Sequence, residues 1–314
     1  MLVGAHEVEV FEGARPRLEA IAYRLLGSAT DAEDAVQDTF LRWQSADRGL
    51  IETPEAWLTK VLTNLCLNRL TSARARRETY VGQWLPEPVF AGDRMLGPED
   101  TVEQRESVSI AMLTLMERLS AKERVVYVLR EAFGHSHGEI AESLDLTESN
   151  CQQIYRRAKQ HLAADRRRVA VDAAAARKII EEFLAAALSG RTDSLVKMLT
   201  DDAISVGDGG GVLFSLPRPV TGALRVARFL RGLFEPSAAK WELIGGRPVL
   251  FASVANGVPA LVLVVEDRIA GIVSLDVTTD GIAAVHAQVN PAKLERAARQ
   301  WATSGQGEPL VFEW

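Results

Sequence analysis

The stretch from Ile21 to Trp43 places the tightest limit on the fold, because one apolar helix ends there and a second begins within a few residues. Gly27 and Ser28 interrupt the helical pattern, and Asp31 is the predicted N-cap of the second helix. Apolar side chains then recur at helical spacing and form a predicted buried stripe: Ala32, Val36, Thr39, Phe40 and Trp43. Helical patterns continue to about residue 78, which predicts an all-α domain.

The opposite face of the second helix is acidic and is expected to point outward. It carries Asp34, Gln37, Asp38 and Leu41. Glu33 and Asp34 lie in the first turn, where the helix dipole favours negative charge. Such a face indicates either a docking surface for another protein or a solvated face that only keeps the chain in solution.

Composition leaves room for two or three domains of an ordinary globular protein, with 314 residues, 47% hydrophobic and 25% charged. No apolar run reaches the length of a membrane span, and the first residues lack a signal-peptide pattern, so a cytoplasmic protein without a membrane partner is expected. The net charge of −6 argues against indiscriminate coating of nucleic acid. Two basic clusters nevertheless close predicted helices: Arg69, Arg74, Arg76 and Arg77, and then Arg156, Arg157, Lys159, Arg166, Arg167 and Arg168.

We do not expect the cysteines or the histidines to form a redox or metal site. Cys66 and Cys151 lie far apart on apolar helical stripes, which predicts small buried hydrophobes, with a redox-sensing thiol as the alternative. His135 and His137 form an H-x-H pair without nearby Cys or Asp, so polar surface is favoured over a zinc site. We therefore expect no metal and no cofactor.

Stretches with proline and glycine divide the chain into five predicted parts. Residues 1–78 are helical, and residues 79–100 form a linker whose apolar residues are unusual for a spacer. Residues 101–168 are helical again. Residues 172–296 begin with a helix and continue, after Gly190, as short β-like runs separated by turns, which predicts an α+β domain. Residues 297–314 are a predicted tail.

Residues 119–162 predict a four-helix unit that ends in a helix-turn-helix. Ser120 and Glu123 form a capping box, and Thr147 is the predicted cap of the last helix. That helix has an apolar stripe of Cys151, Ile154, Ala158 and Leu162. Its other side offers groups that hydrogen-bond base edges and phosphates in the major groove: Ser149, Asn150, Gln152, Gln153, Arg156, Arg157 and Lys159. A polar helix with no DNA partner is the alternative.

A third helix is predicted to begin at Thr53-Pro54-Glu55, where threonine caps and proline takes the first position. Its predicted inner stripe is Trp57, Val61, Leu62, Leu65 and Cys66. Amides and guanidinium groups on the other side could hold an exposed base and its phosphates. This predicted set is Asn64, Asn68 and Arg69, followed by Arg74, Arg76 and Arg77.

These helical modules, in this order, resemble an extracytoplasmic-function sigma factor of bacteria. The resemblance implies that region 2 reads the opened strand of the promoter −10 element and docks on the clamp helices of core RNA polymerase. The docking residues carried over are Asp31, Asp34, Gln37, Asp38 and Leu41. Region 4 would read the −35 duplex through Thr147 to Lys159. A protein of this kind is not an enzyme.

Residues 172–296 resemble a fused SnoaL-like domain of the NTF2-like cone fold, so the implied class is two all-α domains followed by an α+β cone. Three motifs point to this subgroup. The first is the linker motif Trp84, Leu85, Pro86, Glu87 and Pro88; the second is Asp208, Gly209, Gly210 and Gly211; the third is Asn290, Pro291, Lys293 and Leu294, in which Ala292 departs from the usual aspartate. We expect the linker motif to dock beside the other two. The fused domain could then modulate activity and replace a separate anti-sigma factor.

Two other functions remain open at the level of sequence. One is an autonomous helix-turn-helix regulator with a ligand-sensing cone, although such a protein needs no polymerase-docking helix. The other is an isomerase or cyclase in which Asp208 acts as general base. Glycines beside a lone aspartate are explained more simply by a turn, and the sequence offers no second acid.

Overall fold

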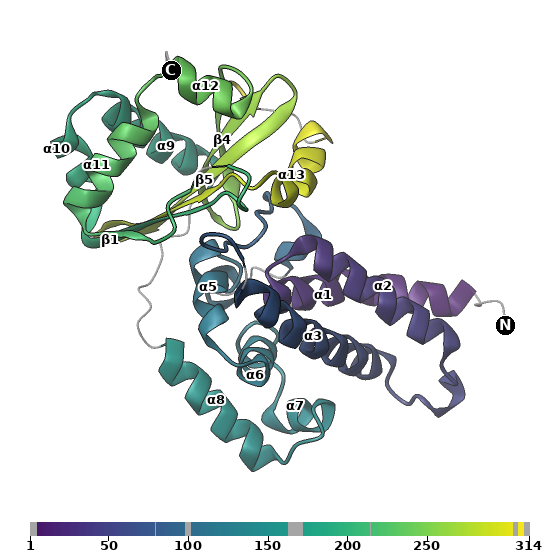
Figure 1. Ribbon diagram of the computed structural model, residues 1–314. Coiled ribbons are helices and arrows are strands. Elements are labelled where there is room, and N and C mark those ends of the chain that lie inside the picture. The colour runs from purple at the N-terminus through teal and green to yellow at the C-terminus, as the bar shows by residue number, and fades with distance from the viewer. Residues whose placement is uncertain are drawn as a thin grey trace. The chain divides into compact units, whose positions relative to one another are not determined.

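The computed structural model describes residues 5–78, 80–97, 102–162, 172–213, 215–303 and 307–310 (Figure 1). The chain forms two compact units. The helical unit comprises residues 1–78, 92–108 and 112–165, and the sheet unit comprises residues 79–91, 109–111 and 166–314. The predicted linker 79–100 is therefore divided, with its first part in the sheet unit and its second part in the helical unit.

The helical unit begins with α1 (Ala5–Leu26), α2 (Ala29–Ser45), the 3-10 helix η1 (Arg48–Leu50) and α3 (Pro54–Glu78). Gly27, with a φ of 67°, makes the predicted break between α1 and α2. The N-cap of α2 is Ser28, whose Oγ accepts from the Asp31 backbone N–H at 3.0 Å. The prediction of Asp31 as cap was wrong, because the serine next to the glycine already satisfies that donor from extended backbone.

The predicted stripe on α2 is confirmed, except that Phe40 is only half-buried and packs against Phe11 at 4.8 Å between ring centroids. On α3 the buried face is centred elsewhere. Leu58, Leu62 and Cys66 are fully buried, whereas the remaining predicted stripe residues are half-buried: Trp57, Val61 and Leu65. The reason is that α3 packs on α1, α2 and α6 at once. Burial raises the pKa of the Cys66 thiol to about 12, so it stays protonated like an apolar side chain.

The second part of the helical unit contains η2 (Arg94–Leu96), α4 (Val102–Glu106), α5 (Ile110–Leu115), η3 (Met116–Arg118), α6 (Ala121–Glu131), α7 (His137–Ser143) and α8 (Glu148–Leu162). Residues 119–162 thus hold three α-helices, not the four predicted, because α5 lies before this segment. The Ser120 capping box is confirmed, and Thr147 Oγ1 accepts from the Asn150 backbone N–H at 3.2 Å.

Two buried arginines join the two parts of this unit. Arg24 on α1 is 0% exposed; its Nε donates to Ser107 Oγ at 2.8 Å and its Nη2 to the Leu96 carbonyl at 2.6 Å. Arg124 on α6 is 2% exposed and donates through Nε to the carbonyl of Arg24 at 3.2 Å. These bonds join α1 to Leu96, in the second part of the predicted linker, to Ser107 and to α6.

The sheet unit contains α9 (Ala173–Leu188), α10 (Thr192–Val196), β1 (Leu199–Asp208), β2 (Val220–Thr221), α11 (Ala223–Phe234), α12 (Ala238–Ile244), β3 (Val249–Ala255), β4 (Val258–Val265), β5 (Arg268–Thr278), β6 (Gly281–Gln288) and α13 (Pro291–Thr303). The strand order is β2-β1-β6-β5-β4-β3. Only β1 and β6 run parallel among the described strand pairs. The predicted α+β class is confirmed.

Both faces of this sheet are covered. One face packs with α9 and α11 around Phe183 and Leu230, and the other packs around Leu294 and Trp301 of α13. The predicted boundary at 296 therefore falls inside α13, and the third motif lies at the start of this helix. Beyond α13, the backbone N–H of Leu310 donates to the Leu250 carbonyl at 2.7 Å. Over the residues that the structure describes, no helix combines the length and apolar character needed to cross a membrane.

Candidate functional sites

The helix α8 presents the predicted DNA-reading face to solvent. All seven predicted side chains are exposed, while Cys151, Ile154, Ala158 and Leu162 are buried as expected. The helix lies at the edge of the helical unit (Figure 1). Arg157 Nε lies 3.9 Å from Glu123 Oε1, and Lys159 Nζ lies over the Tyr155 ring at 5.6 Å. A polar face on an exposed helix with a buried back can enter a major groove.

The predicted docking face of α2 and the predicted strand-reading face of α3 meet at one arginine. Arg69 Nη2 donates to Asp38 Oδ2 at 2.7 Å, and its Nη1 lies 3.9 Å from Asp34 Oδ2. Asp34, Gln37 and Leu41 are exposed, whereas Asp31 and Asp38 are half-buried. Sequence reasoning placed the aspartates and Arg69 in separate sites and missed this ion pair.

The remaining predicted strand-reading residues are only partly visible. Asn64 is half-buried and Asn68 is exposed. The backbones of Arg74, Arg76 and Arg77 belong to α3, but their side chains lie outside the described part of the structure, as do residues Arg166, Arg167 and Arg168.

A cavity of about 650 Å³ lies within the helical unit, between the segment before α3 and the α6–α7 turn. Trp57 lines it from one side and Phe133 from the other. Lys60 Nζ donates to the Glu142 carbonyl at 3.1 Å and to Asp145 Oδ1 at 3.0 Å. Lys60 thus joins α3 to the turn of the helix-turn-helix, which the sequence did not suggest.

His135 lies beside this cavity and is used internally. Its Nε2 lies 3.1 Å from Arg17 Nη2, and burial lowers the pKa of its imidazole. Among the described residues, no group of three or more His, Cys, Asp or Glu side chains could hold a metal ion. The zinc alternative for His135 and His137 therefore finds no ligand set there.

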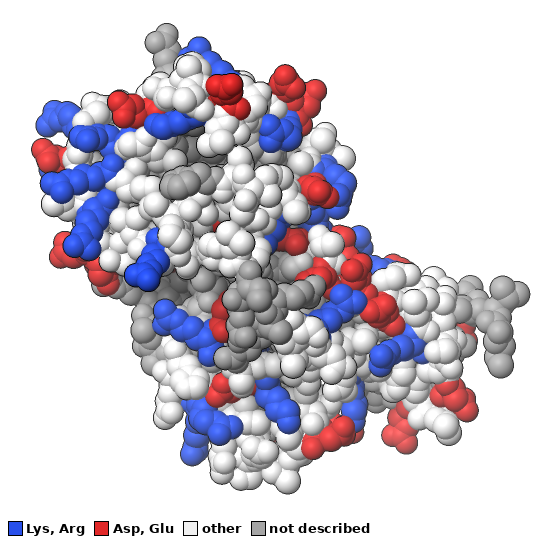
Figure 2. All heavy atoms as spheres, viewed as in Figure 1, with Lys and Arg blue, Asp and Glu red and all other residues white. Residues whose placement is uncertain are grey.

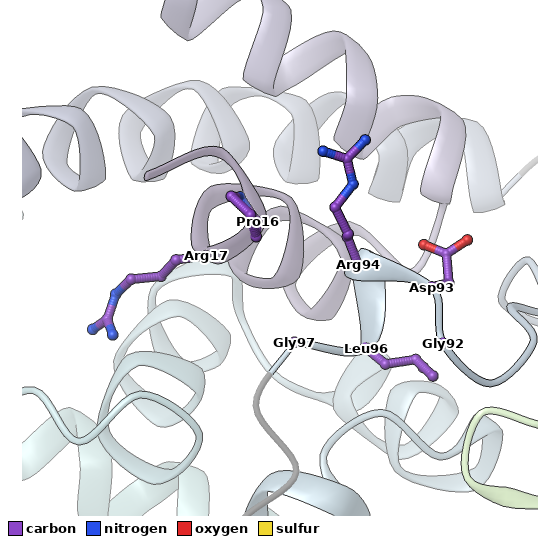
Figure 3. Close-up of a pocket in the computed structure, with 7 residues that line it drawn as sticks. All are labelled: Pro16, Arg17, Gly92, Asp93, Arg94, Leu96 and Gly97. Carbon is purple, nitrogen blue, oxygen red and sulfur yellow. The ribbon is translucent and has the colours of Figure 1, made fainter. Parts of the chain in front are cut away.

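A second cavity, of about 600 Å³, lies between α1 and residues 92–97 (Figure 3). In Figure 3 the side chains of Arg17 and Arg94 point away from each other. Arg94 Nε lies 3.5 Å from Glu19 Oε2, and Asp93 Oδ1 accepts from the Met95 backbone N–H at 2.9 Å. These polar groups are engaged within the protein and do not converge on a ligand.

The three motifs of the sheet unit meet at Asp208, the fully buried last residue of β1. We call this arrangement the linker clamp. Oδ1 of Asp208 accepts from the Tyr80 hydroxyl at 2.6 Å and from the Gly210 backbone N–H at 3.0 Å. Oδ2 accepts from the Leu85 backbone N–H at 2.9 Å and from Lys293 Nζ at 2.6 Å. One carboxylate thus holds two points of the linker, a turn and a helix.

Lys293 contributes more than its ion pair to the linker clamp. Its ammonium group donates to the Leu85 carbonyl at 2.7 Å. It also lies over the rings of Tyr80 and Trp84, at 4.8 and 4.4 Å from their centroids. Cation–π contacts strengthen when the cation is desolvated, and this side chain is 12% exposed. The linker aromatics are therefore held by charge as well as by packing.

Two amide side chains complete the linker clamp. Gln288 Nε2 donates to the Pro86 carbonyl at 3.2 Å and to Asp208 Oδ2 at 3.3 Å, and Asn290 Nδ2 donates to the Tyr80 hydroxyl at 2.8 Å. Burial, with the bond to Asp208, raises the pKa of Tyr80 and keeps its hydroxyl a donor. Of the two amide side chains, only that of Asn290 belongs to a motif predicted from the sequence.

The glycines of the second motif permit this close approach. Gly210 has a φ of 62°, and a Cβ there would collide with the Asn290 side chain. A Cβ on Gly209 would collide with the Leu213 carbonyl. A side chain at Gly210 would push β1 and the start of α13 apart, and one at Gly209 would disrupt the turn of residues 209–213, so the run works as a packing device.

Residues 89–91 of the linker pair with the outer edge of β3. The Asn256 backbone N–H donates to the Val89 carbonyl at 2.8 Å, and the Ala91 N–H donates to the Val254 carbonyl at 3.2 Å. Asn256 Oδ1 accepts from the Val89 N–H at 3.0 Å. Residues 85–90, which include Pro86, Glu87 and Pro88, are all buried. This segment is built into the sheet unit like one of its own strands.

The structure brings the predicted linker motif together with the two other motifs, and it shows what sequence reasoning missed. No sequence pattern indicated that Tyr80 and Gln288 belong to the linker clamp. Nor did one indicate that Asn256, which the sequence marks only as a turn residue, binds the linker. The Asp208 carboxylate accepts from five donors of its own chain. A carboxylate so occupied is a poor general base, which argues against the isomerase alternative.

Comparison with known proteins matches both helical parts to described families. Sigma-70 region 2 matches residues 10–76, and Sigma-70, region 4 matches residues 109–162. The ECF RNA polymerase sigma factor SigJ of Mycobacterium tuberculosis is 38% identical over 230 residues, covering 73% of each chain. The probable ECF RNA polymerase sigma factor SigI of the same organism is 32% identical and covers 90% of this chain and 92% of its own.

The likeness extends to the whole architecture. The crystal structure of the Mycobacterium tuberculosis extracytoplasmic function sigma factor SigJ matches with a TM-score of 0.70 and 30% identity. It covers 91% of this chain, and the match spans 98% of that structure, so the sheet unit is part of the shared fold.

Proposed function

Because this chain belongs to the extracytoplasmic-function sigma factors, we propose that it brings core RNA polymerase to specific promoters in the cytoplasm, and that its C-terminal NTF2-like domain controls this step through the linker. The observation that carries the second part is the linker clamp. It engages the segment that lies in sequence between region 2 and region 4.

Each helical surface has a separate role in this proposal. The α2 face with Asp31, Asp34, Gln37, Asp38 and Leu41 binds the clamp helices of polymerase. The α3 set with Asn64, Asn68 and Arg69 reads the opened −10 strand, and the α8 face reads the −35 duplex. Exposure of the α8 face, and of Asp34, Gln37 and Leu41 on α2, supports these roles.

The linker clamp would act by limiting the distances that the linker can span. A free linker samples many end-to-end distances, whereas residues 80–91 held on the sheet have one path. Two modules joined by a linker bind together most tightly when the linker matches the separation of their sites. A held linker therefore favours promoters with one separation between the −35 and −10 elements. Control within the same chain would replace a separate anti-sigma factor.

Reversing Asp34 and Asp38 to lysine is expected to abolish binding of core polymerase while leaving the domain folded. Surface charge changes usually alter stability little, although Asp38→Lys also places a cation beside Arg69. The measurement is a core-polymerase pull-down with a thermal melt of the same sample. Asp38→Lys combined with Arg69→Glu restores the internal ion pair without restoring the acidic face. Core binding recovered by that exchange would mean that Asp38 serves the fold and not docking.

Changing Arg156 and Arg157 to alanine is expected to weaken promoter binding by the holoenzyme. A lost phosphate contact lowers the slope of log affinity against log salt by about 0.9, whereas a lost base contact relaxes specificity at a cost of roughly 1–3 kcal/mol. Binding to −35 variants at several salt concentrations separates the two. Arg177→Ala combined with Lys178→Ala, which also removes two cations, from α9, is the matched charge control. Unchanged binding of every −35 variant would remove α8 as the reader.

A further inference from the structure

The outer face of α11 carries a column of arginines. Val226, Ala227 and Leu230 are buried against the sheet unit. Arg225, Arg228 and Arg231 recur every three residues on the exposed side, and the helix contains no acidic residue. Each step of three residues rises about 4.5 Å along the axis. Figure 2 shows blue side chains gathered along the flank of the sheet unit that α10 and α11 form.

Among the residues that the structure describes, no carboxylate pairs with these charges. Arg231 Nη1 donates to Thr192 Oγ1 at 3.3 Å, and in the described parts of the chain neither Arg225 nor Arg228 has a hydrogen-bond or ion-pair partner. The neighbouring helix α9 is different, because Arg177 and Lys178 each face a glutamate four residues on, at 2.9 and 4.0 Å. In a chain with a net charge of −6, an uncompensated column of this kind indicates an anionic partner.

We propose that the α11 arginines bind phosphates of the promoter duplex upstream of the −35 element. Guanidinium groups match phosphate oxygens in a two-pronged geometry. The exposed positions at either end of the column, Leu224 and Gly232, offer no group that reads base edges, so the contact is independent of sequence. We name duplex DNA because the column is regular and purely cationic, as a phosphate backbone requires.

The inference rests on the proposed function, because α8 must first hold the −35 duplex. Ala173, where α9 begins, follows the end of α8 at Leu162 by eleven residues. A chain of that length reaches at most about 40 Å. At about 3.4 Å of duplex per base pair, this corresponds to roughly 12 base pairs. The start of α9 therefore lies within that length of the end of α8, which keeps the sheet unit close to the DNA that α8 binds.

The test uses holoenzyme assembled from the full chain and two promoter duplexes. One duplex ends directly upstream of the −35 element, and the other continues for about 20 base pairs. Affinity is measured against salt for the wild type and for the variant Arg225→Ala, Arg228→Ala, Arg231→Ala. On the long duplex the variant should lose roughly ten-fold or more in affinity and about two to three units of salt slope. On the short duplex the two proteins should bind alike.

The control variant Arg177→Ala, Lys178→Ala removes two cations from the same unit and should match the wild type on both duplexes. Alanine favours helix, so circular dichroism should confirm that α11 remains folded. Equal salt slopes for wild type and variant on the long duplex would overturn the proposal. An equal loss on both duplexes would also overturn it, because the arginines would then contact polymerase. Normal initiation on the short duplex distinguishes either result from failure of the proposed sigma function.

Discussion

Replacing Asp208 with alanine is expected to release the linker from the sheet unit and to lower the free energy of unfolding by about 3–5 kcal/mol. The loss is large because Lys293, only 12% exposed, would keep its charge without the carboxylate at 2.6 Å. The Leu85 backbone N–H and the Tyr80 hydroxyl would lose their acceptor as well. Urea unfolding measures the stability, and hydrogen exchange of the backbone amides of Leu85, Glu87, Val89 and Phe90 measures the release.

Two further variants isolate the ion pair from the packing. Asp208→Asn keeps the shape but removes the charge, and adding Lys293→Met removes the cation that was left unpaired. The double variant should recover part of the stability lost by Asp208→Asn, because a buried pair replaced on both sides costs less than one broken on one side. Amides of residues 85–90 that exchange as slowly in Asp208→Ala as in the wild type would show that the linker is held by its apolar side chains alone.

Release of the linker should also change transcription. The Asp208→Ala protein should lose activity on the native promoter and should discriminate less among promoters with altered spacing, because a free linker spans a wider range of distances. Run-off transcription from a series of spacer lengths measures this profile. If the linker amides of the variant exchange freely but its activity depends on spacer length as in the wild type, the linker clamp has a purely structural role.

Replacing Arg24 with methionine is expected to lower the free energy of unfolding of the helical unit by about 1–3 kcal/mol for each buried acceptor that loses its donor. Methionine keeps much of the length, but the Leu96 carbonyl and the Ser107 hydroxyl lose a charged donor at 2.6 and 2.8 Å. The contact of the guanidinium with the Phe133 ring, at 5.2 Å, is lost too. Thermal and urea unfolding should both register the change.

Arg94→Met is the matched control for Arg24→Met. Its side chain is 63% exposed and lies 3.5 Å from Glu19, so its removal should cost well under about 1 kcal/mol, as for exposed ion pairs in general. Similar stability for the two variants would mean that the hydrogen bonds of Arg24 are replaced by water after substitution, and that the buried arginine does not fasten α1 to Leu96 and Ser107.

Local signals predicted the helices well, and long-range contacts decided what the sequence could not. Ser120 and Thr147 were correctly predicted as caps, because a cap is determined within four residues. Asp31 was misread because two capping side chains compete within the same turn, and only the backbone angles of Ser28 decide between them. The strands of the sheet unit were visible in the sequence as short β-like runs separated by turns.

The linker clamp was only half visible for the same reason. Asp208 and Lys293 were found through motifs, but their partner Tyr80 lies 128 positions from Asp208 along the chain and has no local signature. Likewise, no residue near Arg24 reveals that Leu96 and Ser107 will receive its hydrogen bonds. Polar partners chosen across such distances depend on the finished packing, which periodicity alone does not encode.

The pairing of residues 89–91 with β3 also protects the protein from other chains. β3 is the last strand of the sheet, and its Val254 and Asn256 backbone groups bond to the linker. An uncovered strand edge offers unpaired N–H and C=O groups that recruit strands from other molecules. Release of the linker would therefore also expose unpaired backbone groups at the edge of β3. A linker that stays bound to β3 keeps these groups from pairing with strands of other molecules.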